Sequence, residues 1–279
     1  MAKYILSAFA DEAGKSLDEQ IAALQRNGIK FMEIRNVDGV NICQTPLKTV
    51  AEYKEKLDAA GIRVLTIGSC IGKADPGEKY QEHVAMFLHT LGVAKILGAE
   101  RIRMFSLFNY DKETVFAKMR ELLDIAEGTG ITLYHENEKD VYGDIDQRVL
   151  ELMEAFGGRM KFIFDPANFI QCGCYPLDIY PALKDKIDYF HIKDARFATG
   201  SVVPSGKGDG AIAQLLTDFA EDHENVMLTI EPHLKSFDGL KDTKSIREDE
   251  FVYKDHTESF DAAVNALKDI LQERGLSYE

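Results

Sequence analysis

A unit of one short apolar strand and one amphipathic helix repeats eight times along this chain, with roughly 30 residues per unit. The predicted strands are Tyr4–Phe9, Phe31–Arg35, Val64–Ser69, Arg101–Phe105, Ile131–His135, Lys161–Phe164, Ile187–Phe190 and Val226–Ile230. The predicted helices are Leu17–Arg26, Pro46–Ala60, Tyr80–Leu97, Lys112–Glu127, Asp146–Phe156, Leu177–Leu183, Ala211–His223 and Ser259–Arg274. Regular alternation of this kind predicts a parallel sheet, and eight units predict an α/β fold of the (β/α)8 TIM barrel type. Such barrels have about 250 residues, so the chain is expected to form a single domain over residues 1–279.

Charge and hydropathy argue against several classes of partner. The formal net charge is −14 at pH 7, whereas a nucleic-acid-binding surface needs a basic face. The chain has no apolar run of 18 residues and its N-terminus leads directly into a strand, so neither a membrane span nor a signal peptide is expected. The four cysteines, Cys43, Cys70, Cys172 and Cys174, are too few for a disulfide framework and suggest a reduced, cytoplasmic setting.

Four consecutive strands of the predicted barrel run into a residue that can ligate a metal ion. These residues are Glu136, Asp165, His191 and Glu231. An acidic side chain at the end of a fully apolar strand cannot stay unpaired in the core, because burying a lone charge costs several kcal/mol, roughly. Chemistry in TIM barrels lies at the C-terminal ends of the strands. We therefore expect the four side chains to converge on one half of the barrel mouth.

Three carboxylates and one imidazole suit Mn²⁺, Mg²⁺ or Co²⁺, with Zn²⁺ as a further option. Taken singly, each acid is more simply explained as part of a salt bridge or a helix cap, and His191 as a core histidine. Taken together on neighbouring strands, the four residues favour a metal site with open positions for a chelating substrate.

Several short motifs, spread over nearly the whole chain, carry a family resemblance. They are Ser7-Ala8-Phe9-Ala10-Asp11-Glu12, Gly28-Ile29-Lys30-Phe31-Met32-Glu33-Ile34-Arg35, His135-Glu136-Asn137, Asp165-Pro166-Ala167-Asn168, His191-Ile192-Lys193-Asp194, Gly206-Lys207-Gly208-Asp209 and Ile230-Glu231. These motifs resemble those of the sugar isomerase and epimerase barrels of the xylose-isomerase-like superfamily. That superfamily includes ketose 3-epimerases, hydroxypyruvate isomerases and enzymes of inositol catabolism.

The resemblance implies a divalent metal held by Glu136, Asp165, His191 and Glu231, with the two glutamates as the acid/base pair. The chemistry is consistent with this role. Aldose–ketose or epimer exchange removes a proton beside a carbonyl, and a chelated metal stabilises the enediolate that develops. Two carboxylates on opposite sides of the substrate plane can remove a proton from one face and return one to the other face or to the adjacent carbon.

Three further residues are candidates for binding a small-molecule carbohydrate substrate. By the resemblance, Arg196 matches an arginine that contacts a substrate oxygen, and Asn168 stands where many relatives carry a histidine. Glu33, at the end of the second predicted strand, could bind a substrate hydroxyl or a neighbouring lysine, and the substrate is the preferred partner. The chain could act as a homodimer or a tetramer.

Other polar features next to the predicted site are less specific. His135 and His233 adjoin proposed ligands but should point away from them if strand alternation continues. The Gly206–Gly210 loop could cradle a phosphate, yet it matches no known phosphate motif, so a plain turn is preferred. The long stretch Ser236–His256 after the last strand could be a lid or a subunit contact.

Three alternative functions use the same fold. An abasic-site endonuclease would need several more histidines at strand ends, where this chain has Ser69-Cys70, Phe105-Ser106 and Asn168. A dehydratase or lyase that acts on a cyclic hydroxy-ketone, such as an inosose or dehydroshikimate, would use the same metal ligands and stays open. A non-catalytic sugar-binding barrel would be expected to lack a ligand or a glutamate, and none of the four is missing.

Overall fold

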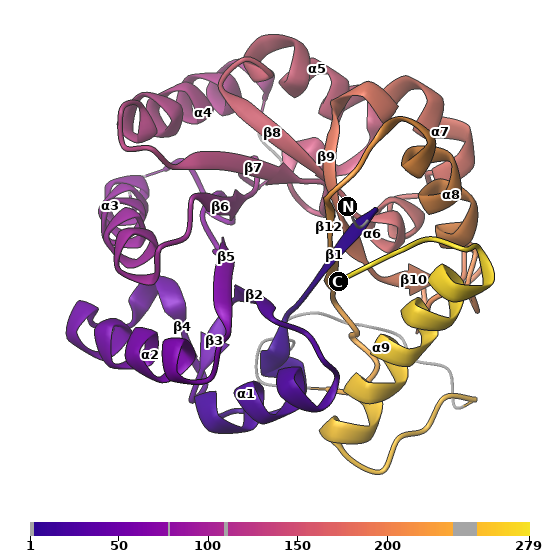
Figure 1. Ribbon diagram of the computed structural model, residues 1–279. Helices are drawn as coiled ribbons and strands as arrows, with labels where there is room; N and C mark the ends of the chain where they lie inside the picture. Colours follow the sequence, from indigo (N-terminus) through magenta and orange to yellow (C-terminus); the bar gives the residue numbers. More distant parts are fainter. Residues whose placement is uncertain (1–2, 78, 109–110, 237–249) are drawn as a thin grey trace.

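The computed structural model describes residues 3–77, 79–108, 111–236 and 250–279, and a closed barrel of eight parallel strands lies at its centre (Figure 1). The barrel strands are β1 (Tyr4–Ala8), β2 (Phe31–Ile34), β5 (Arg63–Gly68), β6 (Arg101–Met104), β7 (Thr132–Glu136), β8 (Met160–Phe164), β9 (Ile187–Ile192) and β12 (Val226–Ile230). They follow one another around the barrel in chain order, and β12 closes it by pairing in parallel with β1. The predicted (β/α)8 TIM barrel is confirmed.

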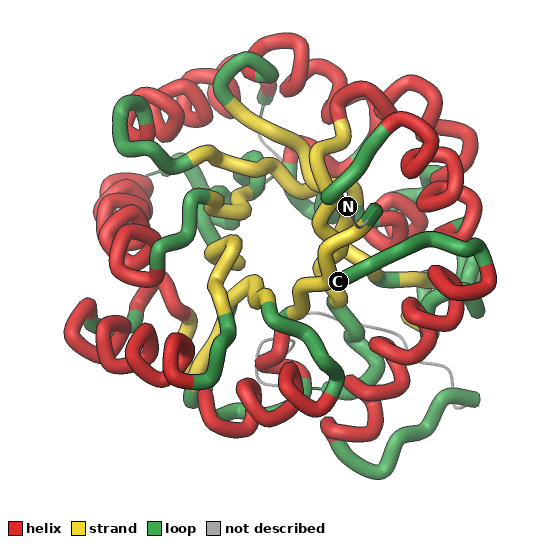
Figure 2. Tube along the Cα trace, viewed as in Figure 1, coloured by secondary structure: helices red, strands yellow, loops and turns green. Residues whose placement is uncertain are grey.

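Helices form an outer ring around the strands (Figure 2). The main helices are α1 (Leu17–Arg26), α2 (Leu47–Ala59), α3 (Tyr80–Leu97), α4 (Lys112–Ala126), α5 (Asp146–Phe156), α7 (Pro176–Leu183), α8 (Ile212–Asp222) and α9 (His256–Glu273). Their starts follow from local capping. At α1, the Ser16 hydroxyl accepts the N–H of Glu19 while the Glu19 carboxylate accepts the N–H of Ser16. Helix α9 begins earlier than predicted because Asp255 caps it by accepting the N–H of Glu258.

The connections at the C-terminal ends of the strands contain small elements that the repeat pattern did not predict. They are the hairpin β3 (Asn36–Val37) with β4 (Val40–Asn41), the short helix α6 (Pro166–Gln171), and the hairpin β10 (Asp194–Ala195) with β11 (Val202–Val203). Helix α6 starts directly at Asp165, whose Oδ1 accepts the backbone N–H of Asn168 at 2.9 Å. These elements shape the mouth of the barrel, where the predicted ligands lie.

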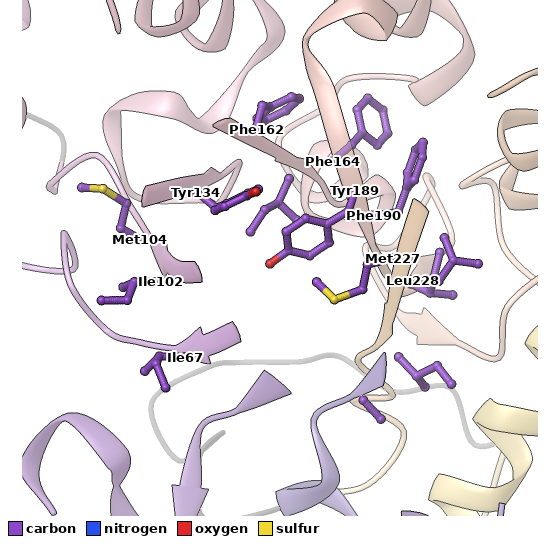
Figure 3. Packing of buried hydrophobic residues seen from close by; sticks show 14 of the residues in the cluster. Ile67, Ile102, Met104, Tyr134, Phe162, Phe164, Tyr189, Phe190, Met227 and Leu228 are labelled. Atoms are coloured by element: carbon purple, nitrogen blue, oxygen red, sulfur yellow. The ribbon is translucent and has the colours of Figure 1, made fainter. Parts of the chain in front are cut away.

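Strand alternation separates two layers of side chains. Figure 3 shows Tyr189 and Met227 turned toward the centre of the barrel, while their chain neighbours Phe190 and Leu228 turn toward the surrounding helices. Both layers are fully or almost fully buried. Because side chains two residues apart point to the same face of a strand, His191 shares the inward face with Tyr189.

No helix of the described residues is long and apolar enough to cross a membrane. The predicted lid or subunit contact over Ser236–His256 falls largely on residues 237–249, which lie outside the described residues.

Candidate metal centre

The four predicted ligands meet at the C-terminal mouth of the barrel. One oxygen or nitrogen atom each of Glu136, Asp165, His191 and Glu231 lies within 4.8 Å of those of the other three. All four side chains are buried. They come from the neighbouring strands β7, β8, β9 and β12. Glu136 and His191 lie within their strands, whereas Asp165 and Glu231 directly follow theirs. The structure thus brings together the set that the strand ends predicted.

The imidazole of His191 is held between two carboxylates. Its Nδ1 lies 2.9 Å from Glu136 Oε1, and its Nε2 lies 3.2 Å from Glu33 Oε2. Glu33 Oε2 also accepts hydrogen bonds from the hydroxyls of Tyr189 (3.2 Å) and Thr229 (2.9 Å). Glu33 therefore orients the ring from below, so that Nδ1 faces the ligand cluster, as carboxylates do behind metal-binding histidines. Burial lowers the pKa of His191, but Glu136 and Glu33 raise it to about 10.

Glu136 is kept ionised by its basic neighbours. Arg103 on β6 donates from Nη1 to Glu136 Oε2 at 2.6 Å, and both side chains are buried. Burial alone would raise the pKa of Glu136, but the charges of His191 and Arg103 lower it below the usual range for a glutamate. The carboxylate is therefore available both as a ligand and as a proton acceptor.

A buried ammonium group bridges two of the predicted ligands. Lys193 Nζ lies 3.0 Å from Asp165 Oδ2 and 3.0 Å from Glu231 Oε2. Burial lowers the pKa of Lys193, but Asp165 and Glu231 raise it well above the ordinary value, so the lysine stays charged. Burial raises the pKa of Asp165 to about 7, although Lys193 acts in the opposite direction.

The second oxygen of Glu231 belongs to another buried network. Arg35 Nη1 donates to Glu231 Oε1 at 2.8 Å and the same guanidinium binds Asp11 and Glu12. Burial raises the pKa of Glu231, but Lys193 and His233 are among the neighbours that lower it well below the usual range. Glu231 thus joins the ligand cluster to the connection after β1.

The chemistry of this cluster fits a divalent cation. Six carboxyl groups face four cationic side chains: those of Asp11, Glu12, Glu33, Glu136, Asp165 and Glu231 against those of Arg35, Arg103, Lys193 and His191. Carboxyl groups outnumber cationic groups, and Asp165 Oδ2 accepts no hydrogen bond of good geometry from the described residues. Ligands at about 2.0–2.2 Å from a shared ion lie up to about 4.4 Å apart, and the four atoms here lie within 4.8 Å of one another. A cation could therefore bind with small side-chain movements.

The three predicted substrate-binding residues lie in different environments. Asn168 is in the cluster, since its side-chain N–H groups approach Glu136 Oε1 at 3.3 Å and the backbone oxygen of Asn137 at 2.9 Å. Glu33 lies beneath His191 and is fully buried. Arg196 lies farther out, where its Nη2 binds Glu250 Oε2 at 2.8 Å.

The alternation prediction holds for one flanking histidine and is wrong for the other. His135 points away from the cluster, with Nε2 3.0 Å from Ser106 Oγ. His233 points toward it, with Nε2 3.3 Å from Glu231 Oε1. The difference arises because the chain leaves the strand at Pro232, and His233 adopts a left-handed φ of 46°.

The glycine-rich loop Gly206–Gly210 is a turn whose backbone N–H groups donate to a carboxylate of the protein itself. The carboxylate of Asp194 accepts the backbone N–H groups of Ala195, Gly206, Gly208 and Gly210 at distances between 2.8 and 3.1 Å. These donors are therefore already occupied, and the preferred interpretation as a plain turn agrees with the structure.

Sequence reasoning did not identify two basic residues of the site, Arg35 and Arg103. The sequence did contain a signal for Arg103. In β6, Arg101 and Arg103 alternate with the apolar Ile102 and Met104, so both arginines lie on the same face of the strand, opposite its apolar face. For Arg35, which follows β2, the partners come from two distant segments, Asp11-Glu12 and Glu231, so no local pattern could indicate them.

Replacing Lys193 by Met should lower the free energy of unfolding of the metal-free protein by about 3–5 kcal/mol, because Asp165 and Glu231 would lose their buried counter-charge. Adding a divalent cation should recover much of this loss. Urea unfolding with and without chelator would measure both effects. Lys56→Met is a matched control: this lysine pairs with Asp18 but its side chain is 54% exposed, so a change within about 1 kcal/mol is expected. Equal losses for the two variants would argue against the buried bridge.

Comparisons with known proteins agree with this architecture. A family model described as the xylose isomerase-like TIM barrel matches residues 21–248. The structure of the IolI protein with a bound zinc atom is 16% identical, with a TM-score of 0.72, and the match covers 98% of this chain and 99% of that one. The D-allulose 3-epimerase from Methylomonas sp. is 17% identical, with a TM-score of 0.70 and coverage of 98% and 99%.

A third similar structure is the probable 3-DHS dehydratase AsbF from Bacillus anthracis. It is 12% identical, with a TM-score of 0.71, and the match covers 96% of this chain and 99% of that one. At such low identities the likeness to these solved structures shows the fold alone. A comparison with curated proteins finds no match.

Proposed function

Because this chain belongs to the xylose isomerase-like TIM barrel family, we propose that it is a divalent-metal-dependent isomerase or epimerase of sugars or sugar phosphates. The observation that carries the proposal is the convergence of Glu136 and Glu231 with Asp165 and His191. The two glutamates belong to β7 and to the end of β12, with β8 and β9 between them. They therefore approach the shared centre from opposite sides. Mn²⁺, Mg²⁺ or Co²⁺ is the proposed ion, and the zinc in the IolI structure keeps Zn²⁺ as a further option.

The bound cation would act as a Lewis acid toward the carbonyl and the neighbouring hydroxyl of the substrate. The protein supplies the proton transfers. One glutamate removes the proton beside the carbonyl, which gives an enediolate of the substrate. The other glutamate returns a proton, to the opposite face in an epimerase or to the adjacent carbon in an isomerase.

Basic side chains bind defined oxygens of the two glutamates. Arg103 holds Oε2 of Glu136, whereas Arg35 and Lys193 hold the two oxygens of Glu231. These contacts orient the carboxylates and keep them ionised, so that each can accept a proton when substrate binds. Water exclusion follows from the burial of all four ligands.

A dehydratase acting on a cyclic hydroxy-ketone is the second candidate. It would use the same first step, proton removal beside a carbonyl, followed by loss of a hydroxyl instead of return of a proton. The fold of the probable 3-DHS dehydratase AsbF is similar over 96% of this chain. The four-ligand set suits either outcome.

The decisive experiment is a substrate screen in D₂O. The protein loaded with each of Mn²⁺, Mg²⁺, Co²⁺ and Zn²⁺ would be incubated with ketoses, sugar phosphates, inosose and dehydroshikimate, and the products followed by NMR. Formation of an isomer or epimer, with deuterium or internally transferred hydrogen at the exchanging carbon, is expected. Elimination of water without epimer formation would favour the dehydratase. If no member of the panel turned over with any of the metals, the proposal would be rejected for these substrate classes.

Arg196→Ala should lower kcat/KM by about tenfold or more, since a charge-assisted hydrogen bond to substrate contributes roughly 1.5–3 kcal/mol. Metal affinity should not change, because the Arg196 guanidinium pairs with Glu250 and not with the four ligands. Arg159→Ala is a matched control: that side chain is 38% exposed against 37% for Arg196 and is also ion-paired. It precedes β8 at the opposite end of the barrel. Unchanged kinetics for Arg196→Ala would remove this residue from the substrate site.

A further inference from the structure

Arg103 is a buried side chain that uses few of its hydrogen-bond donors. It lies on β6, and its side chain is 6% exposed. A guanidinium carries five N–H groups. Within the described residues, Nη1 donates to Glu136 Oε2 at 2.6 Å, whereas the buried Nε has no acceptor and Nη2 donates to none of them. Because buried polar groups in native proteins nearly always have partners, the Nε and Nη2 edge of Arg103 is suited to a ligand.

Two other arginines show what this edge binds in the same protein. Arg26 donates from Nε and Nη2 to the two oxygens of Asp261 at 2.9 and 2.8 Å. Arg35 donates from the same two atoms to the two oxygens of Asp11, at 3.0 Å each. The Nε–H and Nη2–H bonds are parallel, and their spacing matches the two oxygens of a carboxylate. The same edge of Arg103 is thus a carboxylate-binding group that no carboxylate of the described residues occupies.

Arg103 lies beside the ligand cluster, on a strand that carries none of the four ligands. Strand β6 pairs with β7, which carries Glu136. The guanidinium carbon of Arg103 lies 5.3 Å from the centre of the Phe9 ring and 4.6 Å from that of Phe105. The Phe9 ring in turn contacts the His191 ring edge to face, with 5.2 Å between the ring centres. These aromatic contacts hold the guanidinium next to the proposed reaction centre.

We propose that the Nε and Nη2 edge of Arg103 binds a carboxylate of the substrate, so that the substrate is an acidic sugar such as an aldonic or keto-aldonic acid. This carboxylate subsite rests on the proposed isomerase or epimerase function, whose substrate class it narrows. Glu136 sets where the carboxylate lies, since its Oε2 accepts from Arg103 and its Oε1 faces His191. The carboxylate therefore lies close to the carbon whose proton Glu136 removes. The terminal phosphate of a longer sugar would lie farther from that carbon.

The test follows the arginine Nε–H resonances of the ¹⁵N-labelled full chain, with and without Mg²⁺, while non-reacting ligands are added. The ligands are the aldonates D-erythronate, D-ribonate and D-gluconate, and the matched alditols erythritol, ribitol and D-glucitol, which carry a hydroxymethyl group in place of the carboxylate. Without ligand, the Nε–H protons of Arg26 and Arg35 should already be shifted downfield by their carboxylates, and that of Arg103 should not. An aldonate should shift the Arg103 proton downfield, whereas an alditol should not.

Calorimetry would give the size of the effect. At least one aldonate should bind the Mg²⁺-loaded protein about tenfold or more tightly than its alditol, since charge-assisted hydrogen bonds are added. Arg103→Lys keeps a positive charge beside Glu136 but lacks the planar edge, so it should weaken aldonate binding and leave alditol binding unchanged. Arg101→Lys is the matched control, because Arg101 lies on the same face of β6 but over the Tyr134 and Tyr189 rings. It should change neither affinity.

Three results would overturn the carboxylate subsite: an Arg103 Nε–H proton that is downfield before ligand is added, no shift with any aldonate, or an equal shift with the alditols. Ribitol 5-phosphate tests the other oxyanion, and a larger Arg103-dependent affinity for it than for D-ribonate would overturn the acidic-sugar assignment. The wild-type resonance can be assigned through bonds, so this result does not depend on whether Arg103→Lys folds.

The binding result is separate from the substrate screen, because none of these ligands reacts. Turnover of a neutral ketose with no shift of the Arg103 proton would reject the acidic substrate and leave the proposed reaction standing. A shift of the Arg103 proton without turnover of any compound in the screen would reject the proposed reaction for those classes and leave the carboxylate subsite standing.

Discussion

Replacing Glu136 or Glu231 by Gln is expected to reduce kcat by about 10²–10⁴-fold, the usual contribution of a general acid or base. Each substitution keeps the size of the side chain and one acceptor oxygen, but it replaces the other oxygen, which could accept the proton, by an NH2 group that only donates hydrogen bonds. If the two residues act on opposite sides of the same substrate, as we propose, neither can replace the other. Both variants should therefore lose turnover.

Exchange experiments would show which step each variant has lost. If one glutamate removes the proton and the other returns it, one variant should fail to exchange the substrate proton with D₂O, and the other should exchange it without forming product. Glu138→Gln is a suitable control, because Glu138 is nearly buried and ion-paired with Lys73 yet is not one of the four ligands. Full activity in either ligand variant, with metal content unchanged, would reject the two-base assignment.

Removal of the metal by a chelator should abolish activity, and adding back Mn²⁺, Mg²⁺ or Co²⁺ should restore it. The reason lies in the cluster itself: its buried carboxylates exceed its basic side chains, and the substrate would need a cation to polarise its carbonyl. A cation that binds only the folded state stabilises it by about 2.7 kcal/mol at 100 times its dissociation constant. For a domain of this size we expect a rise in Tm of roughly 5–10 °C.

Asp165→Ala provides the control for this metal effect. Helix α6 keeps its remaining contacts, but the variant lacks one of the four ligands, so added cation should raise its Tm little. Calorimetric titration of both proteins would give the affinities directly. If the chelated wild-type protein kept full activity, or if both proteins gained the same Tm, the metal site would not be where the four residues meet.

The barrel and the convergence of its ligands were predictable because both depend on repeating patterns. Helix α3, for example, has the predicted bounds Tyr80–Leu97, and it ends where Gly98 takes a left-handed φ of 71°. The four candidate ligands could be found because strand ends in a closed parallel barrel must share one face. Their positions along the chain therefore predict that their side chains converge.

The elements that were missed are too short to show a period. The hairpin β3–β4 has two residues in each strand, and α6 begins with Pro166, which directly follows the end of a predicted strand at Asp165. A proline in the first helical turn removes no hydrogen bond, so it can start a helix as readily as it ends a strand. Within the site, Lys193 contacts both Asp165 and Glu231. These three residues follow three different strands, β9, β8 and β12. No pattern along one strand could show it.

The anchoring of the glycine loop by Asp194 has a consequence for how this barrel can change its substrate range. A side chain at Gly208 or Gly210 would overlap the Asp194 carboxylate, and lengthening the loop would separate the N–H groups that converge on it. Asp194 lies three residues after His191, so a disturbance there would reach the ligand cluster. Natural or laboratory diversification should therefore spare residues 194–210 and concentrate in connections that are not tied to a ligand-bearing strand, such as the β5–α3 connection.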